Sequence, residues 1–133
     1  MILTEVTNTA TDKDFIDVPR EIYKTDPIWV CPLDNDIRAV FDPKKNTFFQ
    51  HGQCARWVLK SSDGKLIGRV AAFINDLKAY QSPQPLGGMG FFECINDYRA
   101  ATLLFDTAKN WLQERKMEGM LGPINFGEND NYW

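Results

Sequence analysis

The sequence predicts an α/β fold of the α+β kind, in which helices flank a mixed, mostly antiparallel sheet. Two segments that read as strands, Gln53–Lys60 and Lys65–Asn75, lie on either side of Asp63-Gly64, which is typical of an antiparallel hairpin. From Gly88 to Asn125 the chain runs through a short apolar strand, a polar turn, a long amphipathic helix and a further strand. This second pattern is a βαβ unit, so its two strands should be parallel.

The N-terminal segment predicts a strand followed by a helix. Ile2–Val6 is rich in residues that favour strands. Thr11 or Asp12 is a suitable N-cap for a helix over Lys13–Lys24. Pro19 lies inside that range and should split or kink the helix.

A connector and a second helix follow. Two prolines in Thr25–Leu33 predict an extended segment that packs Trp29 against the core. Asp34–Phe41 predicts a short helix with an apolar face, and Asp42-Pro43 should end it.

The hairpin and the strand after it should form the centre of the sheet. Lys65–Asn75 is apolar on both faces over much of its length, as expected of a central strand, and Gly68 marks a bulge. A loop over Asp76–Gly87, rich in proline and glutamine, leads into a strand over Gly88–Cys94. The expected order of elements is β-α-α-β-β-β-α-β.

The longest helix begins after Asn96 or Asp97, either of which is a good N-cap. Its apolar stripe consists of Ala101, Leu104, Phe105, Ala108, Trp111 and Leu112. Gly119 should end the helix in a left-handed turn, and Met120–Ile124 should form the last strand.

Composition limits the class of protein. With 133 residues and 44% hydrophobic content, the chain suits one domain with a core of its own. A formal charge of −3, with no cluster of basic residues, argues against nucleic-acid binding. No leader-like or membrane-spanning run is present, so a cytoplasmic protein without a membrane partner is expected.

The residue types needed for several other chemistries are missing or badly spaced. Cys31, Cys54 and Cys94 are far apart and form no CxxC pair, which predicts free thiols and no metal site. His51 is the one histidine, and no nucleophile motif such as GxSxG accompanies it. A hydrolase is therefore not expected.

Several strings along the chain, DPIWVCPL, GKLIGRVAAFIN, GFFECIND, AKNWLQERKMEG and GPINFGEND, resemble a bacterial family of GNAT-type N-acetyltransferase-like proteins. The resemblance covers nearly the whole chain. Members of that family are longer, so the resemblance implies that residues 1–133 form a single GNAT-like domain at the N-terminal end of a longer protein. The last strands of the GNAT fold would then be missing from this chain.

The resemblance implies an acyl-CoA-dependent N-acyltransferase, with acetyl-CoA or another acyl-CoA as the donor and an amine as the acceptor. Pantetheine would lie along Gly88–Glu93, and the pyrophosphate at the turn Ile95–Ala101. The cofactor-binding residues would be Phe91, Phe92, Cys94, Ile95, Asn96, Asp97, Arg99, Ala100 and Ala101. Asn125, Asn129 and Asp130 would line the acceptor side.

Glu93 is the candidate catalytic residue, because a carboxylate at the end of this strand could take a proton from the attacking amine. The alternative is a carboxylate that faces solvent or pairs with Arg99. Asn96 and Asp97 have a similar alternative as helix caps, and Arg99 as a surface residue.

A different class of function stays open beside the enzyme. GNAT enzymes carry an Arg/Gln-x-x-Gly-x-Gly/Ala turn, whereas Asp97–Thr102 here contains no glycine. This difference favours a catalytically inactive GNAT-shaped structural or interaction module. In either case the fifth strand leaves an open sheet edge, which predicts a homodimer.

Overall fold

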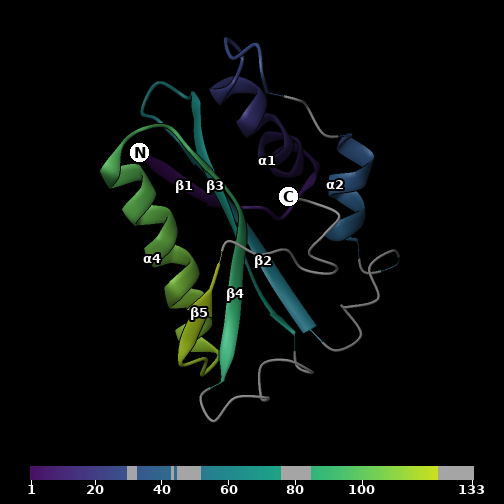
Figure 1. The fold of residues 1–133 in the computed structure, drawn as a ribbon, viewed down its shortest axis with the longest axis vertical. Helices are drawn as coiled ribbons and strands as arrows, with labels where there is room; N and C mark the ends of the chain where they lie inside the picture. The colour runs from purple at the N-terminus through teal and green to yellow at the C-terminus, as the bar shows by residue number, and fades with distance from the viewer. Residues whose placement is uncertain (30–32, 43, 45–51, 76–84, 123–133) are drawn as a thin grey trace.

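The computed structural model describes residues 1–29, 33–42, 44, 52–75 and 85–122. A sheet of five strands has α4 on one face and α1 and α2 on the other (Figure 1). The strands are β1 (Ile2–Glu5), β2 (Gly52–Lys60), β3 (Leu66–Asn75), β4 (Leu86–Cys94) and β5 (Gly119–Leu121). The helices are α1 (Thr9–Ile22), α2 (Asp34–Val40) and α4 (Tyr98–Glu114).

The strand order confirms the predicted fold class and the predicted order of elements. The strands lie in the order β1-β2-β3-β4-β5, and every neighbouring pair is antiparallel except β4 and β5, which are parallel. The β2–β3 hairpin contains the predicted bulge, because Leu59 pairs with Gly68 and Lys60 pairs with Leu66, which leaves Ile67 as the extra residue.

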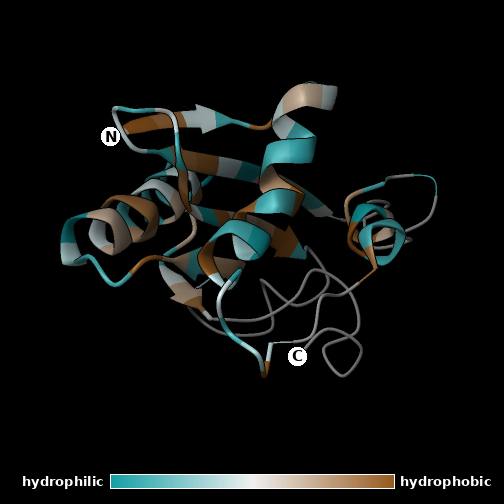
Figure 2. Cartoon of the chain, turned by 90° about the horizontal axis from the view of Figure 1, so that it is seen from above, coloured by the Kyte–Doolittle hydropathy of each residue, from teal (hydrophilic) through white to brown (hydrophobic). Residues whose placement is uncertain are grey.

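Each face of the sheet has its own apolar core. On the α4 face, side chains such as Leu59, Val70 and Ile74 pack against Leu104 and Leu112. The core of the α1/α2 face consists of Phe15, Ile16, Val18, Ile37, Val40, Phe41, Val58, Ala71 and Phe73. The helix ribbons in Figure 2 carry both hydrophilic and hydrophobic segments, as amphipathic helices that cover a sheet do.

Helix α1 differs from its prediction at its start and at its proline. Asn8 is the N-cap instead of Thr11 or Asp12, and the Thr11 hydroxyl takes part in a capping box with it. Pro19 does not split the helix, which continues to Ile22. Sequence alone could not show that the missing backbone N–H of Pro19 would be tolerated, since that depends on the partner of the carbonyl one turn earlier.

The end of α4 also differs from its prediction. The helix ends at Glu114, and Lys116, with φ of 65°, adopts the left-handed conformation expected of Gly119. Gly119 is instead the first residue of β5, and β4 begins at Leu86, two residues earlier than predicted. Of the predicted last strand, the positions beyond 122 lie outside the described residues.

Within the described part of the chain, no helix combines the length and the apolar composition needed to cross a membrane.

Candidate functional site

A bulge interrupts β4 next to the predicted catalytic residue. The β3–β4 register shifts between Arg69 and Ala71, so that Phe91 and Phe92 both stand opposite Val70. Two residues of one strand facing one residue of the other define a β-bulge. Bulges are frequent beside active sites, where they redirect side chains.

The bulge holds a strained residue and sends two aromatic rings to opposite faces. Phe91 has φ of 50°, a conformation that costs a bulky residue about 1–2 kcal/mol. Its ring packs on the α1/α2 face, with its centroid 5.0 Å from that of Phe41. Phe92 lies on the α4 face, where its ring stacks on Phe105 at 4.5 Å.

The pairing of β4 with β5 ends before the bulge. Leu86, Gly87 and Gly88 pair with residues 119–121, and no later residue of β4 pairs with β5 among the residues that the structure describes. Among the described residues, the part of β4 that contains the bulge therefore pairs only with β3.

Glu93 lies one residue beyond the bulge and is hydrogen-bonded to α1. The hydroxyl of Tyr23, the C-cap residue of α1, donates to Oε2 of Glu93 over 2.5 Å. The Tyr23 ring stacks on Trp29, with centroids 5.5 Å apart. The hydrogen bond to Glu93 is the main reason why the pKa of Tyr23 rises to about 12. Tyr23 therefore keeps its proton at neutral pH and holds the Glu93 carboxylate in place.

Arg69 is a buried charged residue beneath the bulge, with 4% of its surface exposed. Its Nε donates to the Phe91 carbonyl and its Nη1 to the Phe15 carbonyl, each over 2.9 Å. Burial lowers the pKa of Arg69 to about 10, while the Glu93 carboxylate favours the charged form. The guanidinium therefore stays positively charged at neutral pH.

The N-terminus of α4 is closed by its own cap. The Asp97 side chain accepts hydrogen bonds from the backbone N–H of Arg99 at 2.9 Å and of Ala100 at 3.4 Å. Ala100 is fully buried, whereas Asn96 and Arg99 are exposed. Asp97 is therefore the N-cap, one of the two residues predicted for it, and its carboxylate lies where a phosphate would meet the helix.

The remaining predicted cofactor residues are spread around the end of β4. Cys94 is half-buried on the α4 face, and burial raises the pKa of its thiol. Ile95 is partly exposed, and its backbone N–H donates to the Ile67 carbonyl. Ala101 is half-buried in the first turn of α4. The structure thus brings the predicted residues to one end of β4 but distributes them over both faces of the sheet.

Some predicted residues cannot be placed. The acceptor-side residues Asn125, Asn129 and Asp130 lie outside the described residues, as do Cys31 and His51.

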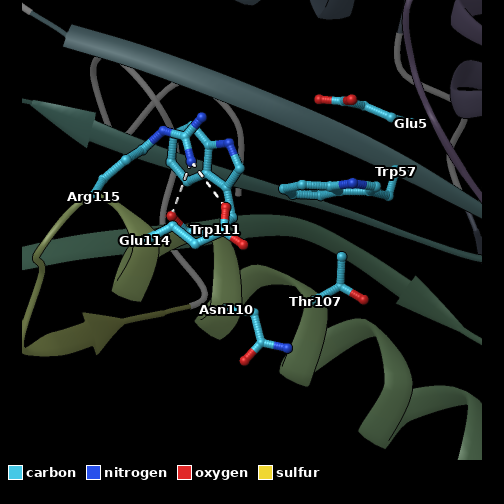
Figure 3. Close-up of a pocket in the computed structure, with 7 residues that line it drawn as sticks. All are labelled: Glu5, Trp57, Thr107, Asn110, Trp111, Glu114 and Arg115. Carbon is cyan, nitrogen blue, oxygen red and sulfur yellow. Dashed lines mark hydrogen bonds and ion pairs between the residues drawn. The ribbon is translucent and has the colours of Figure 1, made fainter.

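A hollow of about 390 Å³ lies on the α4 face between the helix and the first two strands (Figure 3). Its lining residues are Glu5, Trp57, Thr107, Asn110, Trp111, Glu114 and Arg115. The Arg115 guanidinium lies 4.0 Å from the centroid of the Trp111 ring and 3.7 Å from Glu114. Glu93 is on the opposite face of the sheet, so this hollow is not part of the β4 site.

Sequence reasoning missed Tyr23 and Arg69, whose side chains donate hydrogen bonds to β4 at and beside Glu93. A signal for Arg69 was present, because a charged residue in a strand that is otherwise apolar on both faces needs a buried partner. Tyr23 gave no such signal, since it is 70 residues away from Glu93 in the chain.

Comparison with known proteins finds relatives in two bacteria. The chain is 31% identical over 130 residues to a protein named bacterial ceramide synthase from Caulobacter vibrioides, which covers 94% of this chain and 33% of that protein. It is 30% identical over 117 residues to the protein YghO of Escherichia coli, covering 88% of this chain and 30% of that one. The chain thus spans about a third of the length of these relatives, and no family model matches it.

Solved structures share the architecture at low sequence identity. A predicted acetyltransferase from Clostridium acetobutylicum, solved with acetyl-CoA, has a TM-score of 0.62 at 12% identity, covering 99% of this chain and 94% of that one. A putative acetyl transferase from Pyrococcus furiosus has a TM-score of 0.56 at 15% identity, covering 98% and 86%. A GNAT family acetyltransferase from Staphylococcus aureus has a TM-score of 0.56 at 13% identity, covering 92% and 75%.

Proposed function

We propose that the protein transfers an acyl group from an acyl-CoA to an amine. The chain has the fold of the GNAT acyltransferases, which supports this proposal. The observation that carries this proposal is the strained bulge in β4, which stands directly before Glu93 and beyond the last residue paired with β5. Backbone strain of this kind persists where the surrounding structure enforces it, and it concentrates at functional sites.

The proposed reaction joins the amine nitrogen to the thioester carbonyl carbon and breaks the carbon–sulfur bond. One proton leaves the nitrogen, and one proton is gained by the departing CoA sulfur. Glu93 is the proposed base that takes the proton from the amine, and its position is set by the hydroxyl of Tyr23. The remaining contribution of the fold is to hold the two substrates in a reactive orientation.

The acyl donor is proposed to lie against β4 beside the bulge, with its phosphates toward the turn at the start of α4. This part of the strand pairs only with β3 among the described residues. Arg99 is exposed at the first turn of α4, where it can meet a phosphate. Asp97 opposes that contact because it adds a negative charge at the same turn.

The acceptor class is suggested by the relative from Caulobacter vibrioides, whose name describes a ceramide synthase. A ceramide is the amide of a fatty acid and a long-chain amino alcohol, so its synthesis is an N-acylation. We propose a long-chain amine as the acceptor and a fatty acyl-CoA as the donor for the complete protein, of which this chain corresponds to about a third in the relatives.

A catalytically inactive module is the weaker candidate. The absence of glycine from the turn at Asp97–Thr102 supports it. However, a module that only needed a stable sheet would gain nothing from this arrangement. Phe91 has a left-handed backbone conformation, and the nearby Glu93 carboxylate accepts a hydrogen bond of 2.5 Å from the Tyr23 hydroxyl.

The test uses the full-length protein with acetyl-CoA or palmitoyl-CoA as donor and a long-chain amino alcohol as acceptor. Release of the CoA thiol and mass spectrometry of the amide product report the reaction. Glu93→Gln keeps the acceptor for the Tyr23 hydroxyl but removes the base, so kcat should fall by about 10²–10⁴-fold with little change in stability. If neither donor raises the melting temperature at millimolar concentration and no amide forms, the proposal is wrong.

A further inference from the structure

We propose that Arg69 is a positioning residue for binding of the acyl donor, because its guanidinium ties the bulge of β4 to helix α1. The two carbonyls that it contacts belong to Phe91, in the bulge, and to Phe15, in α1, and both distances are 2.9 Å. This inference rests on the proposed function, since it explains how the donor-binding strand keeps its shape.

The Phe15 carbonyl is available because of Pro19. In a regular α-helix the carbonyl of residue 15 would accept from the backbone N–H of residue 19, and proline has no such N–H. Phe15 is fully buried, so its carbonyl needs another donor, and Nη1 of Arg69 fills that need. Pro19, near the end of α1, and Arg69, inside β3, therefore complement each other: the proline leaves a carbonyl without a helical donor, and the arginine supplies one.

The Nε of the same guanidinium stabilises the strained backbone of the bulge. Phe91 is strained, and its carbonyl accepts from Nε of Arg69. The Arg69 guanidinium also lies 4.7 Å from the centroid of the Phe15 ring and 5.8 Å from that of Phe91. A buried charge with these fixed acceptors keeps the bulge and α1 at a constant separation.

Loss of the bulge would have a large effect on the site. Side chains alternate between the two faces of a strand, so removing the one extra residue would move every later side chain of β4 to the opposite face. The Glu93 side chain would then lie on the α4 face and would lose its hydrogen bond with Tyr23, which lies on the α1/α2 face. Holding the bulge therefore decides which face of the sheet carries the proposed base.

Arg56 provides a matched control on the same face. Its guanidinium packs over the same Phe15 ring, at 5.2 Å, but its ion pair, at 2.7 Å, is with Asp12 of α1. Among the described residues, the Arg56 side chain contacts Asp12, Phe15 and Phe41, none of which belongs to β4, and it lies outside the proposed site. Replacing it removes a partly buried arginine from the same core but leaves both hydrogen bonds of Arg69 in place.

The first experiment compares Arg69→Met, Arg69→Lys and Arg56→Met in the full-length protein, with acetyl-CoA as the probe. Loss of a hydrogen bond to a charged donor predicts that Arg69→Met weakens acetyl-CoA binding by about 10- to 100-fold, while Arg56→Met leaves it unchanged. Amide hydrogen exchange at Phe92 and Glu93 should become faster in Arg69→Met than in Arg56→Met. A lysine side chain can donate to one of the two carbonyls but not to both, so Arg69→Lys should have an acetyl-CoA affinity and an exchange rate between those of the wild type and Arg69→Met. If Arg69→Met does not fold, Arg69→Lys replaces it in the comparison.

The second experiment separates a structural role in α1 from the positioning role in β4. Pro19→Ala added to Arg69→Met returns a backbone N–H to the Phe15 carbonyl, so the melting temperature should recover in part. The hydrogen bond from Arg69 to the Phe91 carbonyl is still missing in this double variant, so binding of acetyl-CoA should not recover.

Two results would overturn the inference while leaving the proposed function standing: Arg69→Met binding acetyl-CoA as tightly as Arg56→Met, or Pro19→Ala restoring binding together with the melting temperature. A wild-type protein that binds neither acetyl-CoA nor palmitoyl-CoA would instead overturn the proposed function, and the inference with it.

Discussion

Asp97, at the start of α4, stabilises the helix but opposes the proposed binding of an acyl-CoA phosphate. Its carboxylate accepts from two backbone N–H groups of α4, which stabilises the helix. The same carboxylate repels an anion at a helix end that would otherwise attract one. The GNAT enzymes avoid this conflict with glycines, which this turn lacks.

Asp97→Asn should separate the two effects. Asparagine is an equally good N-cap, so the melting temperature should stay nearly constant, while removal of the charge should tighten binding of CoA several-fold, by about 0.5–1 kcal/mol. Calorimetric titration measures the affinity. Asp97→Ala is the control for the cap alone and should lower stability by about 1 kcal/mol. An unchanged affinity in Asp97→Asn would mean that the phosphates do not approach this turn.

Lys116 is a second residue whose backbone decides more than its side chain. It ends α4 in the left-handed region, and its neighbour Met117 donates its backbone N–H to the Leu112 carbonyl over 3.0 Å. This is the Schellman arrangement, in which glycine is the favoured residue.

Lys116→Gly should therefore stabilise the protein by about 0.5–1 kcal/mol, because it removes the left-handed strain at the cost of some chain entropy. Urea unfolding measures the free energy. The contrasting variant is Lys109→Gly, at an exposed position inside α4, which should cost about 1 kcal/mol. Equal losses in both variants would argue against a strained end of the helix.

At the scale of elements, the contact between the end of α1 and the end of β4 sets the geometry around Glu93. Tyr23 ends α1, and its hydroxyl reaches Glu93 only because the bulge directs that carboxylate to the α1/α2 face. Hydrogen bonds from Tyr23 and from Arg69 thus join the helix to the strand.

The raised pKa of Tyr23 predicts how this contact responds to pH. Tyr23 titrates at about 12 in the folded protein and near 10.0 in the unfolded chain, so its contribution to stability is complete below pH 10 and is lost as the pH rises to 12. Over this interval the wild type should lose stability faster than Tyr23→Phe, as measured by chemical unfolding at each pH. Parallel curves for the two proteins would show that the phenol does not donate to Glu93 in the folded state.

At the scale of the whole molecule, the sheet has two edge strands among the described residues, β1 and β5. β5 is three residues long, and Leu121 at its end is 52% exposed. An exposed apolar edge of this kind favours pairing with another chain.

The homodimer predicted from the open edge can be tested with two substitutions of equal chemistry. Leu121→Lys places a charge on the β5 edge and should convert a dimer into a monomer in light scattering. Ile2→Lys does the same on β1, where Ile2 is 56% exposed, and should leave the dimer intact. A wild-type monomer across the micromolar range would show that the edge is not used.

Much of the architecture followed from local pattern. The Asp63-Gly64 turn predicted the hairpin, and the apolar stripe through Leu104 and Leu112 predicted α4, because the period of a helix or strand is written in neighbouring residues. Errors arose where the end of an element depends on its surroundings. Asn8 is the cap of α1, although Thr11 and Asp12 are also residues that cap helices, and Lys116 ends α4, although Gly119 suits a left-handed turn better.

The candidate site also contains features that the sequence predicted and features that only the tertiary structure shows. Sequence placed Glu93 and Asp97 at the end of a strand and the start of a helix, because both positions follow from the local order strand, turn, helix. Only the tertiary structure joined Tyr23 to Glu93, and Pro19 to Arg69 through the Phe15 carbonyl. Those contacts link residues that are 50 or more positions apart in the chain. The buried hydrogen bonds form only when α1 docks on the sheet in one particular position, and no local sequence pattern specifies that position.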